Sequence, residues 1–163
     1  MRRPLIGGNW KMHKGVRETR EFARDFLRKA PPIKDVDIFV SPPYTSLKTA
    51  KEVFDGTGIE VAAQNMYFEE DGAFTGEISP LFLKEIGIDG VILGHSERRK
   101  IFRESSEIIR KKVDMALRKG LKVIICIGET EEERDSGREK EVVERQLKES
   151  TEGIELDPER VSI

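Results

Sequence analysis

Cysteine is almost absent from this sequence, and long apolar runs are missing altogether. The single cysteine, Cys126, cannot form an internal disulfide, which fits a reducing compartment. No apolar run approaches the ~20 residues that a membrane-spanning helix needs, and the first residues, Met1 to Pro4, contain no apolar signal segment. We therefore expect a cytoplasmic protein that does not enter a membrane.

An excess of either charge is also missing. Lys and Arg together number 29 and Asp and Glu 31, so nothing indicates a surface for nucleic acid or for an acidic membrane. The sequence contains no phosphate-binding motif of the G-x-G-x-x-G or G-x-x-x-x-G-K-[ST] type, and no Cys/His cluster with metal-ligand spacing. The 163 residues are enough for a single domain, 1–163, with a substantial core.

What the chain does contain is a repeated unit of about 30 residues, the length of one βα unit. Each unit has a short apolar run, then polar residues, then an amphipathic segment with the i, i+3, i+4, i+7 spacing of a helix. The apolar runs lie at 5–8, 36–40, 59–64, 91–93 and 121–127. Such a repeat predicts a parallel α/β fold with right-handed crossovers. Periodicity alone leaves open whether the strands form a segment of a barrel or an open, doubly wound sheet.

Several predicted helices have recognisable ends. Ser79 and Pro80 supply an N-cap and a proline at the first helical position, and Leu81-Phe82-Leu83 would form the apolar face of that helix. The pair Pro31-Pro32 would stop the first helix. Further helices are predicted over 46–54, about 105–119 and 138–148, and residues 160–163 look like the start of a sixth strand.

Polar side chains follow the predicted strands, at the end where ligands and catalytic groups collect in parallel α/β proteins. Lys11 could bind a phosphate or carboxylate, or be a solvated surface lysine. His95, one of two histidines, could be a catalyst or a structural hydrogen-bonding group. Glu97 could be an acid, a base, or a carboxylate favoured by the dipole of a helix start. Each of these residues, considered alone, is more often a structural or surface residue than a catalytic one, and Cys126 is expected to be a buried apolar residue.

Five segments change this balance when they are considered together: Gly8–His13, Ala63–Asn65, Gly72–Ser79, Val91–Arg99 and Cys126–Thr130. The sequences G-A-F-T-G-E-I-S at 72–79 and G-H-S-E-R-R at 94–99 are highly specific as a pair. In this order along nearly the whole chain, the segments resemble the triosephosphate isomerase family. The resemblance implies a (β/α)8 TIM barrel. It also implies the interconversion of dihydroxyacetone phosphate and glyceraldehyde 3-phosphate, as in glycolysis and gluconeogenesis, without a cofactor.

The resemblance also assigns roles to individual residues. Lys11 would be the cation for the substrate phosphate and for the charge that develops on the enediolate, with Asn9 lining the site beside it. His95 would donate a hydrogen bond to the carbonyl oxygen and move protons between the two oxygens. The family is itself the standard example of a neutral imidazole that acts in this way at a helix N-terminus, which Ser96 would begin here. Glu97 would be a further active-site glutamate near the lysine.

The Asn65–Glu77 loop is longer than an ordinary βα connection and carries three aromatic residues, Tyr67, Phe68 and Phe74. Exposed aromatics in such a loop are typical of an interface. In the family the corresponding loop inserts into a neighbouring subunit, where its threonine, here Thr75, contacts the active site of the partner. We therefore expect self-association, as a homodimer or larger assembly.

The resemblance covers roughly the first two-thirds of a barrel of about 250 residues, namely five βα units and the start of strand six. It places the general-base glutamate, the mobile lid and the phosphate loops after Ile163. General-base catalysis contributes a factor of order 10²–10⁴, so we expect residues 1–163 alone to be essentially inactive. We also expect an incomplete barrel whose first and fifth strands are edges. The alternative function is a non-catalytic barrel fragment that assembles with itself.

Overall fold

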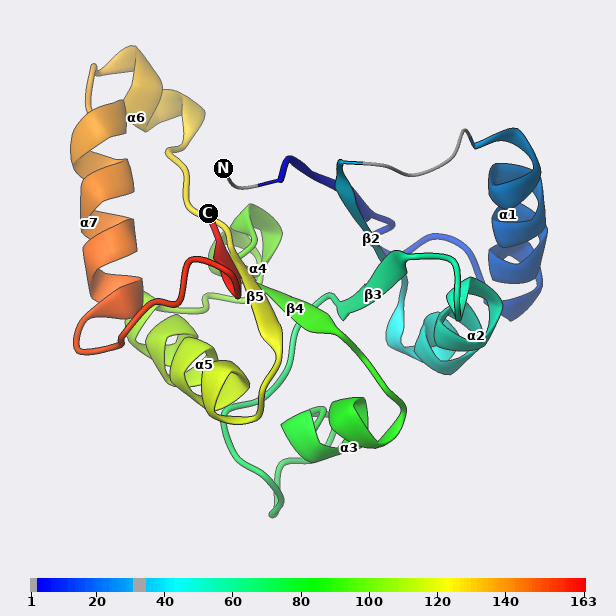
Figure 1. The fold of residues 1–163 in the computed structure, drawn as a ribbon. Coiled ribbons are helices and arrows are strands. Elements are labelled where there is room, and N and C mark those ends of the chain that lie inside the picture. The colour runs from blue at the N-terminus through cyan, green and yellow to red at the C-terminus, as the bar shows by residue number, and fades with distance from the viewer. Residues whose placement is uncertain (1–2, 31–34) are drawn as a thin grey trace.

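The computed structural model describes residues 3–30 and 35–163, and its strands form one curled, parallel, six-stranded sheet (Figure 1). The strands are β1 (Leu5–Asn9), β2 (Asp37–Ser41), β3 (Ile59–Ala63), β4 (Gly90–Leu93), β5 (Lys122–Ile125) and β6 (Val161–Ser162). Their spatial order is their order in the chain. A doubly wound sheet would reverse its strand order, so the structure confirms an incomplete TIM barrel.

Helices surround the outer side of this curled sheet (Figure 1). They are α1 (Val16–Lys29), α2 (Tyr44–Phe54), α3 (Pro80–Glu85), α4 (Ser96–Lys100), α5 (Ser106–Arg118), α6 (Glu131–Asp135) and α7 (Glu139–Thr151). None of the helices in these described ranges is long and apolar enough to cross a bilayer. The pair Pro31-Pro32, predicted to stop the first helix, lies outside the described residues.

Local signals place the starts of two helices correctly. The Ser79 hydroxyl accepts a hydrogen bond from the backbone N–H of Leu81 at 3.0 Å, and Pro80 is the first residue of α3. The Ser105 hydroxyl caps α5 in the same way. The predicted apolar face of α3 is wrong in part, because only Leu83 is buried there while Phe82 remains 59% exposed.

The core lies between the outer face of the sheet and the helices. Alternate strand residues point outward into it, and the helices contribute the opposite wall; its fully buried members include Val61, Val91, Leu93, Ile109 and Val113. Each such aliphatic side chain contributes about 1.5–3 kcal/mol by leaving water. A smaller cluster on the inner face joins Phe39, Ala62 and Ile92 with Ile124 and Cys126. Cys126 is half-buried rather than buried as predicted, and this partial burial raises the pKa of its thiol, which argues against a nucleophilic role.

The sheet ends at β1 and β6. Strand β6 is only two residues long, yet Val161 and Ser162 pair in parallel with Val123 and Ile124 of β5. The prediction that the fifth strand is an edge is therefore wrong, because these last residues already continue the sheet.

The inner face of the sheet encloses a hollow of about 500 Å³ near the N-terminal ends of the strands. Its lining combines apolar side chains such as Phe39 with charged ones that pair with one another, Arg3 with Asp37 at 3.3 Å and Lys122 with Glu60. This end of the inner face therefore mixes apolar side chains with paired charges, and it lies opposite the end at which the strands deliver the candidate site.

Candidate functional site

Strand β4 delivers His95 to the C-terminal end of the sheet. The strand is buried along its whole length, and Gly94 then turns the chain in a left-handed conformation, with φ at +75°. His95 becomes the N-cap of α4, and its Nδ1 accepts a hydrogen bond from the backbone N–H of Glu97 at 3.3 Å. The predicted helix start at Ser96 is thus confirmed. Because Nδ1 is an acceptor, Nε2 is the ring nitrogen that can donate to a ligand.

Lys11, at the end of β1, meets the same helix start. Its Nζ lies 2.6 Å from Glu97 Oε1, and the other carboxylate oxygen lies 3.5 Å from His95 Nδ1. Asn9 Oδ1 accepts a hydrogen bond from the Lys11 backbone N–H at 2.9 Å, which supports a residue with φ at +51°. The hydrogen bond from Lys11 is the main reason why the pKa of Glu97 is lowered, so this carboxylate is ionised at neutral pH. The structure therefore gathers Asn9, at the end of β1, Lys11, just after it, and His95 and Glu97, at the start of α4.

A further residue, Gln64, organises this end of the sheet. Its side-chain Nε2 donates to the backbone carbonyl oxygens of Lys11 and Ser41, both at 2.8 Å. The amide of Gln64, which follows β3, therefore links the end of β2 with the segment after β1. In the sequence Gln64 stands within one of the five segments that carry the family resemblance, and the sequence alone gives it no role. A polar residue directly after an apolar run, like Lys11 and His95, was the signal that could have identified it.

A buried polar cluster lies against α4 and includes a charged residue that sequence reasoning also missed. The Lys112 side chain is only 2% exposed, and its ammonium donates to Glu104 Oε1 at 2.7 Å and to Asn65 Oδ1 at 2.9 Å. Arg98 Nε donates to the same Glu104 oxygen at 2.6 Å. Lys112 lies three residues after Ile109, on the buried face of α5, and this spacing could have indicated its burial.

The structure does not bring Thr75 to these residues. The loop between β3 and α3 projects from the body of the molecule (Figure 1), and Thr75 is exposed on it. No hydrogen bond in the described part of the chain joins Thr75 to Lys11, His95 or Glu97. The loop has its own packing, since the ring of Tyr67 lies 4.2 Å from that of Phe68 and 4.5 Å from that of Phe74. Phe74 is exposed as predicted, whereas Tyr67 and Phe68 are half-buried.

Acidic side chains around the site are bound to cations. Glu97 pairs with Lys11, and Glu129, after β5, pairs with Arg134. Within residues 3–30 and 35–163, no three His, Cys, Asp or Glu side chains are grouped to hold a metal ion. The groups that can act on a ligand here are thus an ammonium, an imidazole and a carboxylate.

The whole sequence was then compared with known protein families. The model of the family described as triosephosphate isomerase matches residues 4–163. The chain belongs to the triosephosphate isomerase family. It is 51% identical over 155 residues to the triosephosphate isomerase of Finegoldia magna, covering 94% of this chain and 61% of that protein.

Two further triosephosphate isomerases show similar agreement. The one from Dictyoglomus thermophilum is 44% identical over 96% of this chain and 63% of its own length. The one from Aquifex aeolicus is 45% identical over 99% of this chain and 65% of its own length. The chain therefore spans 61–65% of the length of these triosephosphate isomerases.

Proposed function

We propose that this chain carries the electrophilic half of an isomerase site that interconverts dihydroxyacetone phosphate and glyceraldehyde 3-phosphate in the cytoplasm. The observation that carries the proposal is the cluster of Lys11, Glu97 and His95, in which the ammonium and the carboxylate lie 2.6 Å apart. A cation and a ring N–H at one point provide stabilisation for negative charge that develops on a substrate oxygen. Membership of the triosephosphate isomerase family supports the choice of a triose phosphate as substrate.

In the proposed reaction a base removes a proton from the carbon beside the carbonyl, and the electron pair moves onto the carbonyl oxygen. The resulting enediolate is reprotonated on the neighbouring carbon, so the reaction needs no cofactor. His95 Nε2–H donates to the oxygen that gains charge and then moves a proton between the two oxygens. The Lys11 ammonium stabilises the same oxygen and the substrate phosphate. Glu97 positions both groups, through its carboxylate and its backbone N–H, and Asn9 holds the backbone of Lys11.

The base in this proposal is not Glu97, because its carboxylate is bound to Lys11. We expect a polypeptide of residues 1–163 alone to convert triose phosphates at a rate near background. The final third of the Finegoldia magna relative, added as a separate polypeptide, is expected to raise the rate by a factor of order 10²–10⁴ or more, because it would supply the base. A coupled assay that follows glyceraldehyde 3-phosphate measures both rates.

The two histidines provide a matched pair of control variants for this assay. His95→Gln should remove the gain in rate, whereas His13→Gln, at an exposed position, should keep it. Turnover by residues 1–163 alone that His95→Gln abolishes would place a working base within this chain and contradict the proposal.

Self-association is the second part of the proposal. The Asn65–Glu77 loop projects with Phe74 exposed at its surface, and β1, at one end of the sheet, leaves Ile6 59% exposed. These surfaces support a homodimer or larger assembly, and the incomplete barrel keeps a non-catalytic self-assembling unit as the alternative function.

Sedimentation equilibrium should give a mass above that of one chain that rises with concentration. Phe74→Ser should lower this mass and Phe82→Ser, on α3, should not. A single-chain mass at every concentration would count against self-association.

A further inference from the structure

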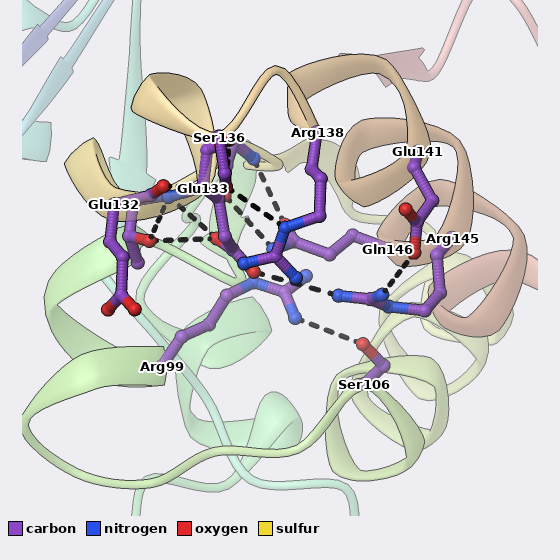
Figure 2. A network of polar contacts seen from close by, with 11 residues as sticks. Arg99, Ser106, Glu132, Glu133, Ser136, Arg138, Glu141, Arg145 and Gln146 are labelled. Carbon is purple, nitrogen blue, oxygen red and sulfur yellow. Dashed lines mark hydrogen bonds and ion pairs between the residues drawn. The ribbon is translucent and has the colours of Figure 1, made fainter.

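The guanidinium of Arg99, on α4, binds four positions, two of them near it in the chain and two, Cys126 and Ser150, far from it. Its Nε donates to the carbonyl oxygen of Gly94 at 2.9 Å, and Nη1 donates to Ser106 Oγ on α5 at 3.1 Å. Its Nη2 donates to Ser150 Oγ on α7 at 3.2 Å and to the carbonyl oxygen of Cys126 at 3.4 Å. Figure 2 shows this side chain extending from α4, with its contact to Ser106. One planar fork therefore connects the ends of β4 and β5 with two helices.

The partners of Arg99 are unusual for a partly buried cation. All four acceptors are neutral, and no carboxylate in the described part of the chain forms an ion pair with this guanidinium. Burial lowers the pKa of Arg99, although an arginine remains charged at neutral pH. Burying a charge without an ion pair lowers stability, so the position of this side chain must have another reason.

The hydrogen bond to Gly94 is the one that reaches the candidate site. The carbonyl of Gly94 belongs to the same rigid, planar peptide unit as the N–H and Cα of His95. Gly94 itself is tightly packed, since a Cβ atom there would lie 2.9 Å from the Cys126 oxygen and 3.1 Å from Arg99 Nη2. Fixing the Gly94 oxygen therefore fixes the position of the His95 Cα, and the start of α4 then sets φ of His95 at −50°.

We propose that Arg99 is a positioning residue for His95. By holding the Gly94 carbonyl against α5, α7 and the end of β5, it keeps the imidazole aimed in one direction before any ligand binds. This role rests on the proposed function, because an electrophile that is already oriented needs no reorganisation as charge develops. It also explains why the guanidinium binds neutral acceptors: these hydrogen bonds hold the Gly94 carbonyl in place and do not need to neutralise a charge.

Imidazole ¹⁵N NMR on the whole chain tests this role directly, and His13 provides an internal reference as the only other histidine. In Arg99→Gln, we expect His95 Nδ1 to lose the chemical shift of a hydrogen-bonded acceptor and to move toward that of His13. The Glu97 amide should exchange its hydrogen roughly five- to tenfold faster, the equivalent of one ordinary hydrogen bond. Lys100→Gln removes one positive charge from an exposed position of the same helix, and it should change neither signal.

Other variants separate positioning from stability. A lower melting temperature in Arg99→Gln with unchanged His95 signals would show a merely structural role and overturn the inference. Arg99→Lys keeps the charge but not the fork, so it should behave as Arg99→Gln does; recovery of the native signal would overturn the argument from the fork. If Arg99→Gln does not fold, Ser106→Ala and Ser150→Ala each remove one contact. Both should then shift His95 Nδ1 part of the way, and unchanged signals would contradict the inference.

These signals do not depend on turnover. An absence of isomerase activity in the assay with the added C-terminal polypeptide would contradict the proposed function and leave the NMR result as it stands. A loss of the positioning effect would leave the proposed function as it stands.

Discussion

Glu104→Gln is expected to lower the free energy of unfolding by about 3–5 kcal/mol, the cost of removing one partner from a buried ion pair. One carboxylate oxygen accepts hydrogen bonds from both Lys112 and Arg98, at 2.7 and 2.6 Å. With the Lys112 side chain only 2% exposed, its ammonium cannot turn toward water when the negative charge is lost. Urea unfolding followed by circular dichroism measures the change.

The matched control for this substitution is Glu107→Gln, three residues further along the chain. Glu107 forms an exposed ion pair with Lys111 on the surface of α5, at 2.9 Å, and its loss should lower the free energy of unfolding far less than the loss of Glu104 does, because water screens the pair. A double variant, Glu104→Gln with Lys112→Met, should recover part of the stability because it also removes the stranded ammonium. Equal costs for Glu104→Gln and Glu107→Gln would refute this account of the cluster.

Gly94→Ala is expected to cost about 2–5 kcal/mol, from the strain of a left-handed alanine and from overlap with its neighbours. The residue has φ at +75°, and a Cβ there would lie 2.9 Å from the backbone oxygen of Cys126. This oxygen belongs to the backbone and can move only with the strand end itself. The substitution should also displace His95, the next residue. Thermal and urea unfolding measure the cost.

Gly120→Ala separates the two contributions to this cost. Gly120 has almost the same backbone angle, φ at +73°, but no atom lies within 4 Å of the position that a Cβ would take. Only the strain of about 1–2 kcal/mol applies there. If the two substitutions lower the free energy of unfolding equally, the close approach of Gly94 to Cys126 contributes nothing to the cost of Gly94→Ala.

Local rules predict much of the fold from the sequence. The serines at 79 and 105 cap their helices because a short side chain can satisfy an N–H group of the first turn, a contact between residues two or three positions apart. The start of α2 was predicted two residues late. Its N-cap, Pro43, has no side-chain hydrogen bond that a sequence pattern could reveal. Elements defined by short-range contacts are therefore predictable, and their ends are less so where no cap exists.

Residues whose position depends on distant partners are harder to predict. The contact of Lys11 with Glu97 joins β1 to α4, and spacing alone left each side chain with a simpler structural interpretation. Only the resemblance to a known family placed them together. The burial of Lys112 and the fork of Arg99 contradict the usual preference of cations for the surface, so composition argued against both. Their positions follow from acceptors that lie on other elements of the fold.

The order of the strands bears on how the chain folds during synthesis. Each strand pairs with the strand that precedes it in the chain, so every new pairing closes a loop of only one βα unit. At about 5–20 residues per second, a unit of about 30 residues leaves the ribosome within a few seconds, and its strand can join a sheet edge that already exists. The strand order therefore allows each pairing, once formed, to be kept as the chain lengthens.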